Sequence, residues 1–252
     1  MKHTINRLFL LLGLVVAFLF FRDELFFNSL IVAICFSFFI LLSIGVLWLR
    51  ANYFLPAIHK VEKPYVLLTF DDGPNPGTTP KILKTLQENH IKAMFFLIGN
   101  KAEKYPEVVE QILKEGHLIG NHTYSHPNLF ALLSSKKVQQ EITKGNDVLK
   151  KFTGEENEWF RPPIGTTNPI IASVIKAMNM KVVGWNKRSF DTVLKNSSLL
   201  KKRVLFLTKP GSIILLHDNL PQTAEMLPSY IKCAKENGIV FANKESINSI
   251  LK

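Results

Sequence analysis

Two apolar runs dominate the first fifty residues of the chain. Leu8–Phe21 contains no charged residue, and Leu25–Leu49 is interrupted only by small polar residues. About 20 apolar residues are enough to cross a bilayer as a helix. The second run has this length, and the first reaches it when its polar flanks lie at the membrane interface. The pattern predicts a transmembrane helical hairpin over residues 1–50, with spans at about residues 5–22 and 27–49.

The first run can also be interpreted as a cleaved signal peptide. No small-x-small cleavage site follows Phe21, and a second long apolar run comes next. A signal peptide requires the cleavage site and does not require the second run, so the sequence favours the hairpin.

The charges around the two runs predict the orientation of the hairpin. Its short connection, Arg22–Glu24, is net negative. Its open end is flanked by the basic residues Lys2, Arg7, Arg50 and Lys60. Because cytoplasmic segments are enriched in Lys and Arg, we expect a bacterial plasma-membrane protein whose remaining chain faces the cytoplasm. A single long span, with Leu8–Phe21 lying in the interface, would place that chain outside.

After a linker at residues 51–62, short apolar runs alternate with amphipathic segments. Strands are expected at Tyr65–Phe70, Ala93–Ile98, His117–Gly120, Trp159–Arg161, Lys181–Trp185, Ser212–His217 and Ile239–Phe241. Helices are expected at Thr79–Asn89, Pro106–Glu115, Ser134–Lys151, Pro169–Asn179, Ser197–Thr208 and Ala224–Glu236. Such repeated units imply one α/β domain of parallel strands over residues 63–252. Such units form a barrel if the sheet closes on itself, and they form a doubly wound sheet if it stays open. No GxGxxG follows the first strand, so a dinucleotide-binding sheet lacks its main support.

Composition and charge exclude several classes of protein. A hydrophobic fraction of 47% excludes a disordered chain, and two cysteines exclude a disulfide scaffold or a four-thiolate zinc module. Ten of the eleven net positive charges lie on residues 50–252, which favours anionic lipid or phosphorylated partners. The chain has no zinc finger, Arg-rich stripe or aromatic–basic motif, so we expect no nucleic acid partner. Nothing in the sequence indicates a protein partner.

Titratable and cationic side chains follow most of the expected strands. They are Asp71 and Asp72 after the first strand, His122 and His126 after the third, Arg161 at the end of the fourth, Asp191 after the fifth and His217 at the end of the sixth. In barrels of parallel strands, catalytic groups gather at the carboxyl ends of the strands. The distribution therefore predicts a catalytic site at that end.

Three of these residues form a candidate metal site. The spacing of His122 and His126 places two imidazoles on one face of a helical turn, and Asp72 adds an oxygen ligand. Three protein ligands with an open position are the catalytic zinc arrangement. Asp71 is adjacent to Asp72, so we expect the two side chains to diverge and Asp71 to accept a proton from water. The alternative interpretation is that Asp-Asp-Gly-Pro is only a turn.

Four motifs in this order resemble the signature of NodB-type polysaccharide deacetylases, carbohydrate esterase family 4. They are Thr-Phe-Asp-Asp-Gly-Pro at 69–74, the histidine pair at 122 and 126, Arg-Pro-Pro-x-Gly at 161–165 and Leu-x-His at 215–217. The resemblance covers about residues 62–245. It implies a deformed (β/α) barrel, hydrolysis of N-acetyl groups on amino sugars, and one divalent metal ion, most commonly zinc.

The resemblance also implies a role for each motif residue. Asp72, His122 and His126 resemble the metal ligands, Asp71 the general base and His217 the general acid. Arg161 resembles the residue that orients Asp71 and holds it ionised, and Asp191 the carboxylate that tunes His217. An imidazole paired with a carboxylate has its proton-donating form stabilised, which agrees with this assignment. A backbone N–H in the Arg-Pro-Pro loop would help to stabilise the oxyanion.

Two departures from the family pattern concern the substrate site. Ile164 stands where the family usually has Tyr, and Thr192 where it usually has Trp. We expect Trp185 to supply the missing aromatic wall beside the acetyl pocket. The residues expected to contact substrate are Pro163, Ile164, Gly165, Trp185 and Leu215.

Together these features predict a membrane-anchored, metal-dependent hydrolase of carbon–nitrogen bonds that deacetylates an amino sugar in a glycan or lipid-linked precursor. A cytoplasmic domain cannot reach mature peptidoglycan, so a lipid-linked sugar in the membrane is the expected partner. The alternatives are an outer-face deacetylase of peptidoglycan or exopolysaccharide, a catalytically inactive carbohydrate-binding protein, and an enzyme that removes formyl or another small acyl group.

Overall fold

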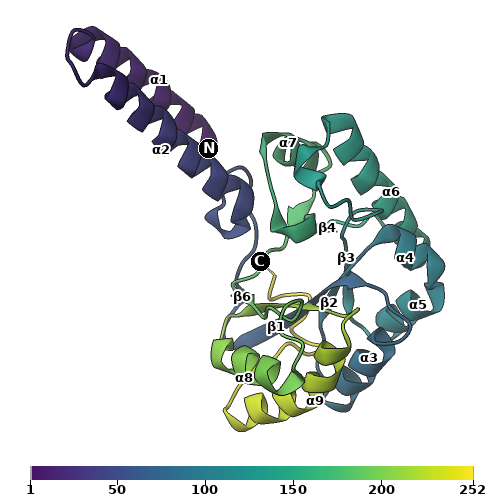
Figure 1. Ribbon diagram of the computed structural model, residues 1–252. Helices are drawn as coiled ribbons and strands as arrows, with labels where there is room; N and C mark the ends of the chain where they lie inside the picture. The colour runs from purple at the N-terminus through teal and green to yellow at the C-terminus, as the bar shows by residue number, and fades with distance from the viewer. Residues whose placement is uncertain (1, 252) are drawn as a thin grey trace.

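The computed structural model describes residues 2–251, which form a long helical hairpin and an α/β domain (Figure 1). Helices α1 (Lys2–Phe21) and α2 (Phe27–Leu47) lie side by side and project away from the domain. Both are long and apolar enough to cross a membrane, judged by length and composition. Their outward side chains are largely exposed, as at Phe20, which is 72% exposed. This is the surface that lipid would cover.

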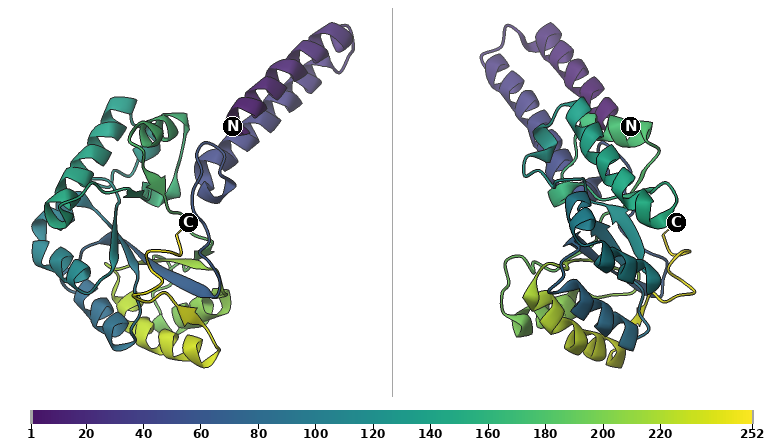
Figure 2. Two further views of the ribbon diagram at one scale, coloured as in Figure 1. Left: turned by 180° about the vertical axis from the view of Figure 1, so that it is seen from behind. Right: turned by 90° about the vertical axis from the view of Figure 1, so that its right-hand side faces the viewer.

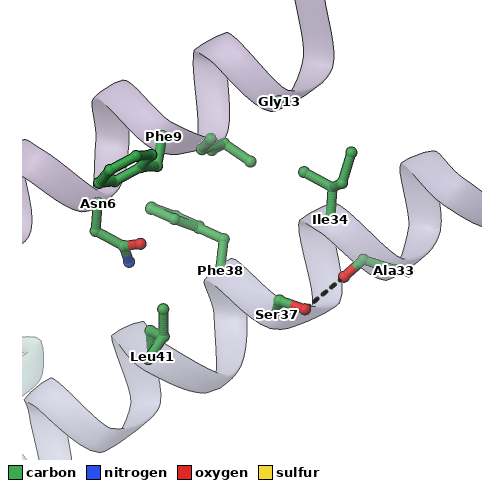
Figure 3. Close-up of a pocket in the computed structure, with 9 residues that line it drawn as sticks. Asn6, Phe9, Gly13, Ala33, Ile34, Ser37, Phe38 and Leu41 are labelled. Atoms are coloured by element: carbon green, nitrogen blue, oxygen red, sulfur yellow. Dashed lines mark hydrogen bonds between the residues drawn. The ribbon is translucent and has the colours of Figure 1, made fainter. Parts of the chain in front are cut away.

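Small and aromatic residues line the contact between α1 and α2 (Figure 3). Gly13 of α1 faces Ile34 of α2, and a Cβ atom at Gly13 would make an ordinary contact of 3.7 Å with Ile34 Cγ2. Phe9 of α1 and Phe38 of α2 both point into the space between the helices (Figure 3). The expected hairpin is thus the arrangement found in the structure.

The domain is built on a curled sheet in which every strand pair is parallel. Its strands are β1 (Tyr65–Gly73), β2 (Met94–Leu97), β3 (Leu118–Asn121), β4 (Trp159–Phe160), β5 (Lys181–Val182), β6 (Lys187–Arg188), β7 (Ile213–His217) and β8 (Val240–Phe241). Their order is β5-β4-β3-β2-β1-β7-β6, and β8 pairs with the start of β1. The expected deformed barrel is confirmed as a partly open, half-barrel form.

Helices cover the outside of the curled sheet (Figure 2). They are α3 (Thr79–Glu88), α4 (Gly99–Lys104), α5 (Pro106–Lys114), α6 (Ser135–Thr153), α7 (Pro169–Ala177), α8 (Ser197–Leu207) and α9 (Pro221–Glu236). Three short 3-10 helices are η1 (Leu49–Ala51), η2 (Phe130–Leu132) and η3 (Pro163–Gly165).

The side-chain alternation of β1 separates the core from the site. Val66, Leu68 and Phe70 point outward and pack with the surrounding helices. Leu67 lies on the opposite face, with the inner cluster of the barrel. Because successive strand residues point to opposite faces, Asp71 shares the inner face with Leu67. The strand is buried on both faces, so its sequence is almost continuously apolar.

Residues 57–61 lie along the opening between the two ends of the sheet. Ile58 forms a parallel bridge with Val183, and Lys60 forms an antiparallel bridge with Ser212. Ile58 N donates to Val182 O at 2.8 Å, and Gly184 N donates to Ile58 O at 2.8 Å. Part of the segment that we assigned to a linker therefore contributes to the barrel wall.

The structure contains short elements that the sequence pattern did not predict, among them β6 and α4. The expected strand Lys181–Trp185 is shortened, because β5 ends at Val182, and β6 begins two residues beyond Trp185. Helix α4 is also unexpected. Both β6 and α4 are too short to display a hydrophobic period, and both are rich in polar residues.

The base of α2 is bound to the α/β domain. Thr167, which lies between η3 and α7, donates its N–H to Val46 O at 3.1 Å and its hydroxyl to Gly45 O at 3.0 Å. A Cβ atom at Gly45 would lie 2.3 Å from the ring of Tyr53, so only glycine fits there. These contacts place the end of α2 beside the Arg-Pro-Pro loop (Figure 1).

Candidate active site

A β-bulge at the end of β1 directs two carboxylates into the same site. The register of β1 against β2 shifts between Asp71 and Gly73, and Asp72 has a left-handed φ of 70°. His122 Nε2 lies 3.9 Å from Asp71 Oδ2 and 3.6 Å from Asp72 Oδ1. Lys101 of α4 supports the bulge by donating to the Asp72 carbonyl at 2.7 Å. The expectation that the two side chains diverge was wrong, because the bulge cancels the strand alternation.

The two histidines are joined by a loop and not by a helical turn. Thr123 and His126 have positive φ values of 68° and 52°, and no helix lies between residues 122 and 126. Thr123 Oγ1 accepts the N–H of His126 at 3.0 Å, and Asn121 Oδ1 accepts the N–H of Thr123 at 2.6 Å. The helical interpretation of the spacing was therefore wrong. The loop nevertheless brings the ring centres of His122 and His126 to 4.9 Å.

Asp72, His122 and His126 fit a divalent metal ion. One ligand atom from each lies within 4.8 Å of the others, and Asp72 Oδ1 is 3.4 Å from His126 Nε2. Ligands of a tetrahedral ion with bonds of about 2.0–2.1 Å lie about 3.3–3.5 Å apart, close to these values. His122 Nδ1 donates to Arg161 O at 2.7 Å, so Nε2 carries the lone pair. Burial also lowers the pKa of His122 to about 3, which keeps the ring neutral.

Arg161 is fully buried and holds Asp71 in place. Its Nη1 donates to Asp71 Oδ1 at 2.7 Å and to Thr69 Oγ1 at 2.8 Å. Its Nε and Nη2 donate to the carbonyls of Val183 and Gly184 at 2.9 and 2.8 Å. Burial raises the pKa of Asp71, and the charge of Arg161 opposes that shift. The carboxylate is thus fixed in orientation and more basic than an exposed one.

His217 and Asp191 form a second charged pair across the site. His217 Nδ1 donates to Asp191 Oδ1 at 2.8 Å, and the His217 backbone N–H donates to Oδ2 at 2.7 Å. Thr223 of α9 donates to the same Oδ2 at 2.9 Å. Burial alone would lower the pKa of His217, but the hydrogen bond and charge of Asp191 raise it to about 9. The imidazole is therefore cationic at neutral pH, and its Nε2 takes no part in the hydrogen bond to Asp191.

These groups surround one cavity of about 180 Å³. Its walls are Asp71, Asp72, His122, His126, Ile164, Gly165, Trp185, Arg188, Thr192, Leu215 and His217. Four of the five expected substrate residues therefore line it, whereas Pro163 is buried and does not. Gly165 is required, because its φ is 74° and a Cβ atom would lie 2.4 Å from Trp185 Cη2. Trp185, which we expect to form the aromatic wall, lines the cavity.

The sequence analysis missed Asp218 as a support of the site. It is fully buried, its Oδ2 accepts from Thr79 Oγ1 at 2.7 Å, and its N–H donates to Asp71 O at 3.2 Å. A Cβ atom at Gly73 would lie 2.1 Å from Asp218 Oδ2, so the side chain packs directly under the bulge. Burial raises the pKa of Asp218 to about 7. The available signal was an acidic residue directly after His217.

Arg188 was also missed. It lines the cavity from β6, which consists only of Lys187 and Arg188 and which the sequence pattern did not predict. Its guanidinium carbon lies 5.1 Å from the centre of the Phe190 ring. The wall of the cavity therefore contains a guanidinium group in addition to the carboxylates of Asp71 and Asp72.

Comparison with known proteins agrees with this geometry. Residues 59–183 match the family model described as polysaccharide deacetylase. The chain is 37% identical over 193 residues to the peptidoglycan-N-acetylglucosamine deacetylase of Bacillus cereus, covering 74% of this chain and 69% of that protein. It is 34% identical over 187 residues to the peptidoglycan-N-acetylmuramic acid deacetylase PdaC of Bacillus subtilis, covering 74% of this chain and 39% of PdaC.

Solved structures show the same fold. The structure of PdaC matches with a TM-score of 0.68 at 33% identity, covering 73% of this chain and 89% of that chain. A CE4 family pseudoenzyme from Bacillus anthracis matches with a TM-score of 0.70 at 28% identity, covering 78% and 69%. The sequence, the fold and the site agree that the chain belongs to the polysaccharide deacetylase family, the carbohydrate esterase family 4 of metal-dependent hydrolases that cleave carbon–nitrogen bonds in N-acetylated glycans.

Proposed function

We propose that this chain is a membrane-anchored, zinc-dependent peptidoglycan N-deacetylase whose catalytic domain lies on the outer face of the bacterial plasma membrane. The observation that carries the proposal is one cavity with a three-ligand metal site between two charged pairs, Asp71–Arg161 and His217–Asp191. The peptidoglycan deacetylases among its relatives support this substrate over the lipid-linked precursor that the charge pattern favoured.

The two charged pairs supply the base and the acid for amide hydrolysis. Asp71 accepts a proton from the attacking water, and His217 donates a proton to the departing amine nitrogen, giving acetate and a free amino sugar. A divalent ion held by Asp72, His122 and His126 would polarise the acetyl carbonyl and acidify water.

The Arg-Pro-Pro loop supplies a backbone donor to the same reaction. Gly165 and Thr166 donate their N–H groups to the carbonyls of Pro162 and Pro163. Prolines have no N–H, so we assign the N–H of Ile164 to the oxyanion that forms in the transition state.

An inactive carbohydrate-binding protein is the competing function, because one structural relative is a pseudoenzyme. A binding protein has no need of a buried, ion-paired base or of a histidine whose pKa is raised to about 9. Both features are retained in this chain. We therefore favour the active enzyme.

Acetate release from peptidoglycan tests the proposed function directly. The full chain, purified in detergent with zinc, is expected to release one acetate for each free amine that appears in the glycan. Release of formate in place of acetate would identify the deformylase alternative. Glycan binding without release of either acid would contradict the proposal and favour the binding protein. Asp71→Asn serves as the matched inactive control.

The side of the membrane is tested separately. A phosphatase that is active only outside the plasma membrane, fused after Lys252, is expected to be active, because peptidoglycan lies there. An inactive phosphatase in a stable fusion would contradict the outer-face proposal. It would support instead the cytoplasmic orientation expected from the basic residues at the open end of the hairpin.

Asp191→Asn is expected to change the pH dependence of turnover. A raised pKa means that His217 keeps its proton up to about pH 9. Without the charge of Asp191, the largest contribution that raises the pKa of His217 is lost, so the pKa falls and the alkaline limb of kcat/KM moves to lower pH. The measurement is a pH–rate profile on an N-acetylglucosamine tetramer. The exposed residue Asp147 offers the control Asp147→Asn, and an unmoved alkaline limb in Asp191→Asn would refute the pairing.

A further inference from the structure

A second cavity adjoins the catalytic one on its membrane side. It has a volume of about 250 Å³ and is lined by Leu47, Trp48, Leu49, Arg50, Ile164, Trp185, Asn186 and Arg188. Ile164, Trp185 and Arg188 also line the catalytic cavity, so the two spaces share a wall. The opposite wall comes from the end of α2 and from η1. A molecule extending out of the catalytic cavity past these residues therefore meets the segment that leaves the membrane hairpin.

The segment that forms this wall is fixed to the domain. Leu49 is buried, and a Cβ atom at Gly184 would lie 3.2 Å from Leu49 Cδ2 and 2.5 Å from His59 Nδ1. His59 Nε2 donates to Asn52 Oδ1 at 2.9 Å, just beyond η1. Together with the contacts of Thr167 to α2, these interactions hold Arg50 at the rim of the cavity.

Positive charge is concentrated around this second cavity. Burial lowers the pKa of Lys187, and so do the nearby charges of Lys209, Arg50 and Lys60. Arg188 lies next to Lys187 and lines both cavities. Within residues 2–251, no salt bridge joins any of these five side chains to a carboxylate. A cluster of like charges without internal partners is suited to an anionic ligand.

We propose that the second cavity is a substrate subsite for a carboxylate-bearing sugar next to the sugar that is deacetylated. The guanidinium groups of Arg50 and Arg188 bind the carboxylate, for which their planar donors are well matched. Trp48 and Trp185 offer aromatic faces to the sugar ring. This inference rests on the proposed function, since muramic acid units whose stem peptide has been removed carry a free carboxylate and glucosamine units do not.

The shared wall favours substrate over lipid as the occupant. A lipid headgroup would need only the charge at the end of α2, whereas this cavity shares the wall residues Ile164, Trp185 and Arg188 with the catalytic one. The membrane-exit segment then has a second role besides anchoring, because it selects the part of the glycan that enters the site.

The test compares two soluble oligosaccharides on the full chain. One is a peptide-free tetrasaccharide of alternating glucosamine and muramic acid with free carboxylates, and the other is a neutral N-acetylglucosamine tetramer. Arg50→Gln is expected to lower the ratio of kcat/KM, carboxylated over neutral, by about tenfold. Lys136→Gln, which removes an exposed positive charge on α6, is the matched control and should leave the ratio unchanged. Added salt should lower the ratio in the wild type more than in Arg50→Gln.

Each of the following outcomes would contradict the subsite proposal. An equal fall on both oligosaccharides would mean that Arg50 only supports the fold, and an unchanged ratio would mean that no carboxylate binds there. An unchanged ratio with weaker binding to phosphatidylglycerol vesicles would assign Arg50 to lipid.

If the wild type turned over neither oligosaccharide, that result would contradict the proposed function and would not bear on the subsite. The affinity of both oligosaccharides for wild type and Arg50→Gln, measured at equilibrium without turnover, would then decide the subsite. The subsite proposal is supported if Arg50→Gln loses about tenfold in affinity for the carboxylated oligosaccharide alone, and any other result contradicts it.

Discussion

Asp71→Asn is expected to lose about 10²- to 10⁴-fold in kcat while keeping its metal ion. Asparagine has the same shape as aspartate but cannot accept the proton of the attacking water. The metal ligands Asp72, His122 and His126 are unchanged, so the site should still bind one ion. The measurements are acetate release and metal content per chain, made on the same preparation.

The same substitution leaves Arg161 buried without its counter-charge, which costs about 3–5 kcal/mol when a buried pair is broken. Turnover must therefore be expressed per folded chain, with circular dichroism and metal content as the measures of folding. Asp147→Asn again provides an exposed control. Near wild-type turnover in a folded, metal-loaded Asp71→Asn would show that another group is the base.

His126→Ala is expected to lose its metal ion and nearly all activity. A ligand in direct contact should weaken zinc binding by more than the about 10- to 100-fold that follows loss of an outer-shell partner. His126 is the most suitable ligand to remove, because its side chain is 21% exposed, whereas that of His122 is 2% exposed. His122 also donates to the Arg161 carbonyl, so its loss would disturb the loop.

Zinc affinity, measured by competition with a chromophoric chelator, is the readout for this variant. His90→Ala removes an exposed histidine outside the site and should retain one ion per chain. Excess zinc should restore part of the activity of His126→Ala, because two ligands remain. An unchanged zinc affinity would rule out this ligand set.

The amino-acid sequence by itself indicated most of the helices and strands and the candidate catalytic residues. The long apolar runs predicted the α1–α2 hairpin, because length and hydropathy are local properties. The alternation of apolar and amphipathic segments predicted the parallel α/β fold, which the structure and its relatives confirm. The motif residues around Asp71 and His217 could be identified because each follows a strand, and parallel strands present their carboxyl ends at one edge. Their individual roles stay predictions until the variants are measured.

Only the tertiary structure decided how those side chains meet. The bulge at Asp72 depends on Asp218 and Lys101, which reach it from distant parts of the chain, so the spacing of Asp71 and Asp72 could not reveal it. The placement of Arg50 and Arg188 around one cavity likewise depends on the docking of α2 on Thr167. Periodicity reports which face of an element is buried, whereas such contacts arise from packing between elements far apart in sequence. The sequence therefore indicates the candidate catalytic groups, and the packing of the hairpin against the barrel decides what adjoins them.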